Sequence, residues 1–372
     1  MKILIAGDFC PQNRVSSLLD DGKYEAVLGD IKPINEQADY SIVNFECPII
    51  YGGEKPIIKC GPNLSCSKKG LEAVKWAGFD CITLANNHFL DYGEDGVENT
   101  ISACKEIGLD NVGGGATLAE AARILYKEIK GSRVGIINCC EHEFSIATET
   151  TAGSNPLNPI QQYYAIREAR NNAEYVLVIV HGGHEHFQLP SPRMQELYRF
   201  FVDAGADAVV NHHQHCFSGY EIYNNKPILY GLGNFCFDRP NEINGIWNEG
   251  CLAILSFGES IDFELVPYTQ CTTDAKVSIV TNREGFEDKI TELNGYISDD
   301  IKLRNAVIEY YKKCQNQYSN IFEPIRNRIY YALKSRGWLP SFISNKRKIV
   351  AANFIGCESH RDKVLFFLNH NQ

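Results

Sequence analysis

Histidines are concentrated in one part of this chain, where eight of the ten lie between residues 88 and 215. Most of them follow apolar runs and stand in segments rich in Gly or Asn, at residues 85–91, 181–186 and 211–215. A neutral imidazole offers one directional lone pair, and carboxylate and amide oxygens complete a mixed shell that suits Mn, Fe or Zn. The clustering therefore predicts a transition-metal site.

An alternation of strands and helices carries these segments. Helical periodicity is clear near residues 97–107 and 194–201, and the second helix has Ser191 as a candidate N-cap with Pro192 at its first position. This alternation predicts a layered α/β domain with strands buried on both faces. The predicted strands are residues 2–7, 40–46, 81–86, 134–140, 175–181, 208–213, 227–231, 251–257 and 262–267.

Polar side chains stand at the carboxyl ends of five of these strands, where ligands gather in such sheets. We therefore expect them to meet at one rim of the fold. The residues, in chain order, are Asp8, Glu46, Asn87 with His88, His181, and His213 with His215.

This order of residue types matches the ligands of a two-metal hydrolase. Two cations roughly 3.5–4 Å apart need a bridging carboxylate, terminal His or Asn ligands and an activated water between them. Such a site attacks phosphorus or carbonyl centres. The expected cofactor is therefore a divalent transition metal, as two ions of Mn, Fe or Zn.

Several motifs together resemble the CapA family of capsule and poly-gamma-glutamate biosynthesis proteins, over roughly residues 1–270. The motifs are Gly7-Asp8, residues 44–48 (NFECP), residues 84–93 (LANNHFLDYG), His181 with Gly183 and Glu185, residues 203–215, and residues 226–235 (KPILYGLGNF).

The resemblance implies a four-layered αββα sandwich similar to the calcineurin-like metallophosphoesterases, with a dinuclear metal site. Residues 1–270 would form this domain and residues 271–372 a helical C-terminal extension. By the resemblance His88 would be the catalytic residue, and Asp8, Glu46, Asn87, His181, His213 and His215 would be the metal ligands. Asn86, Asp91, Glu185 and Asn234 would support these ligands or contact the substrate.

Two departures from the phosphoesterase pattern keep a second function open. Those enzymes usually begin with Asp-x-His, whereas Cys10 stands two residues after Asp8, and Glu46 takes the place of a bridging Asp. The favoured function is a metal-dependent hydrolase, with phosphoesterase chemistry, in capsule or surface-polysaccharide biosynthesis. The alternative is a non-catalytic assembly or polymer-binding factor that keeps the fold.

Other histidines have plainer interpretations. His142, His184 and His186 are expected to lie beside the site rather than in it. In an extended segment side chains alternate, so His213 and His215 would share one face while His212 points away. His360, next to Arg361 and near Glu358, is a candidate for a second site, but a structural role is favoured.

Composition limits the class of protein. A net charge of −10 and a pI near 5.5 argue against a nucleic-acid binder, so the expected partners are a small-molecule or polymer substrate, phosphorylated substrates included, and other capsule-synthesis proteins. No apolar run reaches the roughly 18 residues of a membrane span, and the first apolar run is too short for a signal peptide. A cytoplasmic protein is expected. The 14 cysteines are mostly scattered singly, which is typical of reduced thiols.

The last hundred residues carry a different pattern. Residues 299–318 and 321–337 are predicted to form two charged amphipathic helices, followed by a basic stretch at residues 344–348. That stretch is expected to be a solvated helix face, with an anionic partner as the alternative.

Overall fold

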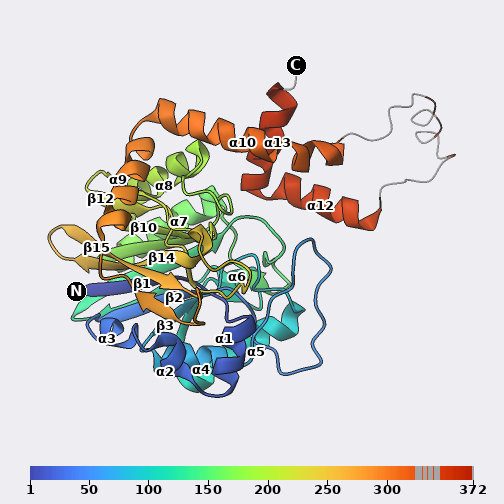
Figure 1. Ribbon diagram of the computed structural model, residues 1–372. Helices are drawn as coiled ribbons and strands as arrows, with labels where there is room; N and C mark the ends of the chain where they lie inside the picture. The colour runs from blue at the N-terminus through green and yellow to red at the C-terminus, as the bar shows by residue number, and fades with distance from the viewer. Residues whose placement is uncertain (323–328, 330–332, 334–337, 339–343, 371–372) are drawn as a thin grey trace.

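Two β-sheets form the centre of the protein in the computed structural model, which describes residues 1–322, 329, 333, 338 and 344–370 (Figure 1). The larger sheet has the order β16-β15-β14-β1-β2-β3-β4, and β13 also pairs with β1. Its strands are β1 (Lys2–Phe9), β2 (Tyr40–Phe45), β3 (Cys81–Thr83), β4 (Asp110–Val112), β13 (Asn234–Cys236), β14 (Glu249–Phe257), β15 (Ile261–Gln270) and β16 (Val277–Ile279).

The smaller sheet has six strands in the order β11-β12-β10-β9-β7-β6. Its strands are β6 (Leu125–Ile129), β7 (Ser132–Cys140), β9 (Tyr175–His181), β10 (Ala208–His212), β11 (Tyr220–Tyr223) and β12 (Lys226–Leu229). Strands β7, β9, β10 and β12 run parallel to one another, as do β1, β2, β3 and β4 in the larger sheet. A separate pair joins β5 (Gly114–Gly115) to β8 (Gly153–Ser154).

The two faces of β1 contact different cores, because side chains alternate along a strand. Ile3 and Ile5 pack toward the smaller sheet, while Leu4 and Ala6 pack against the helices that cover the outer face of the larger sheet. These helices are α1 (Asn13–Asp20), α2 (Tyr24–Leu28), α4 (Lys69–Trp76) and α5 (Gly93–Ile107). The outer face of the smaller sheet is covered by α7 (Pro159–Asn172) and α8 (Pro192–Ala204). The predicted four-layered αββα order is therefore confirmed.

Every apolar run predicted as a strand belongs to one of the two sheets, although the ends differ by a few residues. The predicted start of α8 is also confirmed, since the Ser191 hydroxyl accepts a hydrogen bond from the Met194 amide. Shorter elements complete the domain: α3 (Lys32–Asn35), α6 (Leu118–Ala121) and the 3-10 turn η1 (Ile246–Asn248).

The C-terminal part is helical and gathers at one end of the molecule (Figure 1). Its helices are α9 (Glu284–Ile297), α10 (Asp300–Phe322), α12 (Asn345–Gly356) and α13 (Glu358–His370). Helix α13 packs against both α10 and α12. The predicted helix at residues 299–318 is confirmed by α10, whereas most of the one predicted at 321–337 lies outside the described residues.

The division at residue 270 stays a prediction, and β16 still pairs with β15 beyond it. Among the described residues, no helix is both long and apolar enough to cross a membrane.

Candidate metal centre

The carboxyl ends of parallel strands from both sheets meet at one place and bring the predicted ligands together. Asp8 lies near the end of β1, Glu46 directly follows β2, and His181 ends β9. The loop after β3 supplies Asn87, and the turn after β10 supplies His213 and His215. All six side chains are buried, with at most a few per cent of their surface exposed.

A chain of hydrogen bonds fixes the Asp8 carboxylate. The Asn44 amide donates to Asp8 Oδ1 over 2.7 Å, and the Thr83 hydroxyl donates to Asn44 Oδ1 over 3.1 Å. The backbone amide of His213 donates to Asp8 Oδ2 over 3.2 Å. Sequence reasoning gave Asn44 and Thr83 no role, although both face the site from adjacent strands β2 and β3.

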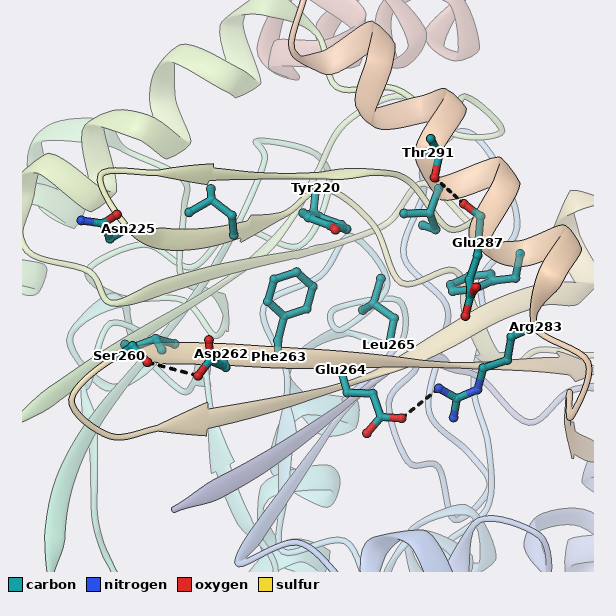
Figure 2. A pocket seen from close by; sticks show the side chains of 14 residues that line it. Tyr220, Asn225, Ser260, Asp262, Phe263, Glu264, Leu265, Arg283, Glu287 and Thr291 are labelled. Atoms are coloured by element: carbon teal, nitrogen blue, oxygen red, sulfur yellow. Dashed lines mark hydrogen bonds and ion pairs between the residues drawn. The ribbon is translucent and has the colours of Figure 1, made fainter.

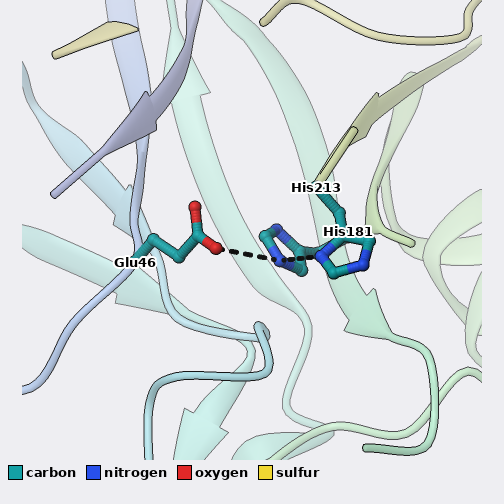
Figure 3. A group of neighbouring side chains, drawn as sticks. All are labelled: Glu46, His181 and His213. Atoms are coloured by element: carbon teal, nitrogen blue, oxygen red, sulfur yellow. Dashed lines mark hydrogen bonds and ion pairs between the residues drawn. The ribbon is translucent and has the colours of Figure 1, made fainter. Parts of the chain in front are cut away.

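Glu46 occupies the centre of the cluster, with no exposed surface and no hydrogen-bond partner for either carboxylate oxygen among the described residues. Figure 3 shows it beside two imidazoles. Its Oε1 lies 3.6 Å from His181 Nε2 and 3.8 Å from His215 Nε2. A buried carboxylate without partners is costly, because burial removes its water without replacing it.

His181 lies where ligands from three loops converge. Its Nε2 is 3.0 Å from Asn87 Oδ1 and 3.1 Å from His213 Nδ1. Its Nδ1 is 3.2 Å from the Asn44 amide nitrogen. Asn87 and His213 thus face the same space as Glu46.

The turn after β10 adopts backbone angles that most residues avoid. His213 has a φ of 87° and His215 a φ of 56°, both in the left-handed region. Such strain persists only where the surrounding structure enforces it, and it is common at functional sites. Asn234 anchors the turn, since its Oδ1 lies 2.9 Å from His215 Nδ1 and its amide donates to the His215 carbonyl.

The expectation that His212 points away from the site was wrong. Its Nδ1 lies 3.6 Å from Asp8 Oδ1, and neither ring nitrogen has a hydrogen-bond partner among the described residues. The alternation rule fails because β10 ends at His212, so the left-handed residue His213 breaks the extended backbone. His212 therefore joins the ring of groups around Asp8.

Burial favours the neutral form of three imidazoles in this cluster, those of His181, His212 and His215. It lowers the pKa of His212 and of His215 to about 3, and it lowers that of His181 well below its ordinary value, with His213 adding to the effect. Neutral imidazoles have the free lone pair that a metal requires.

The carboxylates of the same cluster resist ionisation. Burial raises the pKa of Asp8 to about 6, although the hydrogen bond from Asn44 opposes the shift. Burial followed by the charge of Asp8 raises the pKa of Glu46 well above its ordinary value. A bound cation would lower the pKa values of both carboxyl groups, because its positive charge favours their ionised forms.

The donor set fits a metal centre. Two groups of ligand atoms lie close enough to share an ion: one joins Glu46, His181 and His213, and the other joins Asp8, Glu46 and His215. Glu46 belongs to both groups, which is the position of a bridging carboxylate. Together with the unpartnered Glu46 oxygens, this arrangement supports a metal centre with Glu46 between two positions.

His88 lies at the edge of the cluster in a charged setting. Its Nδ1 is 2.6 Å from Asp91 Oδ2 and 3.1 Å from the ammonium group of Lys59, which also forms an ion pair with Asp91. Asp91 additionally accepts from the Leu64 amide, so it fixes the loop rather than capping α5. The sequence gave no reason to select Lys59, which comes from an irregular segment.

The remaining predicted residues support the surroundings. Asn86 donates to the Phe45 carbonyl and accepts from the His88 amide, so it shapes the loop that carries His88. Glu185 is exposed, and its carbonyl accepts from the Tyr310 hydroxyl of α10. Cys10 is buried, and its sulfur accepts from the Gln12 amide over 3.4 Å.

One carboxylate that sequence reasoning missed connects the centre to the C-terminal helices. Glu143, in the loop after β7, accepts from the Asn87 amide over 3.2 Å. Its other oxygen lies 3.4 Å from His360 Nε2 on α13.

A surface pocket of about 670 Å³ lies elsewhere, between β11, β15 and α9 (Figure 2). Some of its polar side chains pair with one another, as in the 2.9 Å ion pair between Arg283 and Glu264. None of the predicted metal ligands lines this pocket, so the cluster at the strand ends is the candidate functional site.

Comparison with solved structures finds similarity at low identity. A 5'-nucleotidase precursor from Thermus thermophilus aligns with a TM-score of 0.44 and 13% identity, over 85% of this chain and 59% of that one. A 5'-nucleotidase from Candida albicans aligns with a TM-score of 0.42 and 10% identity, over 84% of this chain and 57% of that one.

Sequence relatives are closer. "Capsule biosynthesis protein CapA" of Bacillus anthracis is 35% identical over 247 residues, which are 64% of this chain and 60% of the relative. "PGA biosynthesis protein CapA" of Bacillus subtilis (strain 168) is 32% identical over 237 residues, which are 63% of this chain and 62% of the relative. The matches thus span about three fifths of the length of these relatives.

The family match covers most of the αββα domain. The sequence model described as "Bacterial capsule synthesis protein PGA_cap" matches residues 2–239, a range that contains every ligand of the candidate metal centre. The chain therefore belongs to the family of bacterial capsule synthesis proteins, and it is similar to the CapA proteins.

Proposed function

We propose that this protein is a metal-dependent hydrolase, with phosphoesters as its substrates, that acts in the synthesis of a capsule or another surface polymer. The observation that carries the proposal is the buried, unpartnered carboxylate of Glu46, which two groups of nitrogen and oxygen donors share. Family membership supports the biological setting, and the donor set supports the chemistry.

The residues divide into holding and reacting groups. Asp8, Glu46, Asn87, His181, His213 and His215 would hold the ions, with His212 beside Asp8. Ions bound between such ligands supply an activated water and stabilise negative charge on a phosphoryl oxygen. The low exposure of these side chains excludes bulk water, which strengthens every charge interaction in the site.

His88 is proposed as the group that protonates the leaving oxygen. The Asp91 carboxylate accepts a hydrogen bond from Nδ1 of the His88 ring. Nε2 is then the ring atom that can hold or release a proton. Lys59 contributes a positive charge beside the same ring and so favours an anionic substrate group there. Asp91 thus orients the imidazole and keeps Lys59 in place.

A substrate panel tests this function. The metal-loaded full chain is assayed with phosphomonoesters, phosphodiesters and gamma-glutamyl peptides, beside His88→Ala and a control, His186→Ala, which removes an exposed imidazole from a neighbouring loop. We expect phosphoester hydrolysis that falls roughly a hundredfold or more in His88→Ala and little in the control. Activity unchanged in His88→Ala would contradict the role of that residue.

A non-catalytic assembly or polymer-binding factor is the competing function. Cys10 favours it, because its thiol faces Gln12 in place of a metal-binding imidazole. Metal-loaded protein without activity on any member of the panel would support this alternative over the hydrolase.

A further inference from the structure

A second set of metal-type side chains lies where the C-terminal helices meet the αββα domain. Cys357 directly precedes α13, and His360 lies three residues later in the first turn of that helix. Glu143 approaches them from the loop after β7. One ligand atom from each of the three lies within 4.8 Å of the others.

The donors of this set are held in place before any ion binds. His360 Nε2 lies 3.4 Å from Glu143 Oε1, and the ring of His360 stacks on Phe354 with centroids 5.1 Å apart. Cys357 is 1% exposed, and its thiol donates to Glu141 over 3.8 Å. His360 and Glu143 keep 23% and 9% of their side-chain surface exposed, which leaves an approach for an ion.

The charges around the thiol favour a cation. Two carboxylates, Glu141 and Glu143, lie close to Cys357, and burial together with these charges raises the pKa of its thiol well above the ordinary value. Arg193 balances only the first of them, through a 2.6 Å contact with Glu141. A divalent ion would compensate Glu143 and the thiolate together, since metal binding deprotonates a coordinating thiol.

We propose that Glu143, Cys357 and His360 bind a single zinc-class divalent ion, separate from the centre around Glu46. One sulfur, one nitrogen and one oxygen donor suit Zn²⁺, and three protein ligands leave a fourth position open to water. The ion would join the C-terminal helices to the domain, because two of its ligands come from the start of α13 and one from the loop after β7.

The two centres would be neighbours connected by one residue. Glu143 also accepts from the Asn87 amide, so occupancy of the second centre would fix the orientation of a ligand of the first. Two of its three ligands, Cys357 and His360, lie beyond residues 2–239, whereas Glu143 lies within the segment that the family model matches.

Cobalt distinguishes the second centre from the first, because only the second contains a thiolate. Metal-free full-length protein is titrated with Co²⁺ while the near-ultraviolet sulfur-to-cobalt charge-transfer band is recorded. We expect a band that saturates when each chain holds a single thiolate-bound cobalt. Cobalt binding without this band would overturn the proposal.

Substitutions identify the residues that give rise to the charge-transfer band. It should vanish in Cys357→Ser and persist both in Cys104→Ser, a control for loss of another buried thiol, and in Glu46→Gln, which alters only the first centre. A band that survives Cys357→Ser, or that is lost in Glu46→Gln instead, would overturn the proposal.

A second variant tests the site even if Cys357→Ser does not fold. His360→Gln keeps a hydrogen-bond donor toward Glu143 but removes the imidazole ligand. This substitution should lower the affinity of the thiolate site for cobalt by more than roughly 10- to 100-fold, which is the loss expected for a residue that only supports a ligand. Unchanged affinity would contradict a role for His360 as a ligand.

Discussion

The two clusters of metal-type ligands differ in how their polar atoms are satisfied without an ion. In the first centre both oxygens of Glu46 lack a hydrogen-bond partner among the described residues. In the second cluster Glu143 faces His360 and Asn87, and the thiol of Cys357 donates to Glu141. A cation would therefore stabilise the first arrangement, whereas the second is compatible with the fold either way.

The two clusters should therefore affect stability and activity differently when they are substituted. An unsatisfied buried carboxylate destabilises the metal-free protein. A bound ion would stabilise the folded protein by pairing with that carboxylate. A paired cluster contributes to the docking of the C-terminal helices in both states. Substitutions in the first centre should therefore act on metal binding and catalysis, and substitutions in the second on the attachment of α13.

The largest contrast is expected in turnover. His88→Ala should lower kcat for a phosphoester by roughly 10²- to 10⁴-fold with metal content unchanged, because it removes a proton donor and not a ligand. His360→Gln should lower kcat less, by roughly 10- to 100-fold at most, because it acts on the first centre only through Glu143 and Asn87. Steady-state kinetics with elemental analysis of the same samples measures both, and equal losses in the two variants would remove the functional distinction between the clusters.

The attachment of α13 is expected to depend most on Arg193, which contacts Glu141 over 2.6 Å and Asp362 over 2.9 Å. Arg193→Ala leaves two carboxylates without their cation, and since the arginine is 26% exposed we expect a cost of about 2–3 kcal/mol. Hydrogen exchange should show lost protection at residues 345–368. Arg199→Ala, which breaks a pair between α8 and Glu221 of β11, is the control, and an equal loss there would contradict the account.

Glu46→Gln should have opposite effects with and without metal. Without metal, the variant should be more stable than the wild type at pH 7 by roughly 1–3 kcal/mol, because it removes an unsatisfied buried carboxylate. The pKa of Glu46 is raised in the folded state, so this advantage should be absent below the ordinary value of 4.5 and grow as pH rises above it. Denaturant unfolding at several pH values measures the effect.

Added metal completes that comparison. Mn²⁺ or Zn²⁺ should raise the Tm of the wild type and raise that of Glu46→Gln much less, since the shared ligand is lost. An equal Tm increase in both proteins would mean that Glu46 is not a ligand.

A smaller effect is expected from pH. Burial raises the pKa of Asp8 to about 6, so below that pH its carboxyl group must lose a proton to bind an ion. His212 and His215, with pKa values lowered to about 3, remain neutral in this range and do not compete. Apparent metal affinity should fall at least roughly tenfold per pH unit below about 6, since Glu46, whose pKa is also raised, must lose its proton as well. Calorimetry that detects no proton release on binding between about pH 5 and 6 would contradict this assignment.

The sequence was sufficient to predict which side chains meet at the strand ends. Asp8 is the penultimate residue of a buried strand, Glu46 directly follows one and His181 ends one, and parallel strands necessarily bring their carboxyl ends together. The same rule could not place His212, because its orientation depends on the left-handed backbone at His213. Local periodicity carries no information about such a turn.

Long-range packing explains the other omissions. Lys59 reaches His88 from an irregular segment, and Glu143 gains its significance only from α13, which lies far along the chain. Sequence reasoning favoured a structural role for His360, because separation along the chain gave no indication that it lies near Glu143. Contacts of this kind follow from tertiary packing alone.

The central proposal is that Glu46 would lie between two metal ions. A crystal structure of the Mn²⁺-soaked protein, with anomalous differences recorded at the manganese edge, tests it most directly. We predict two peaks roughly 3.5–4 Å apart, one beside His181 and His213 and the other beside Asp8 and His215. A map without a peak within bonding distance of Glu46 would contradict the account.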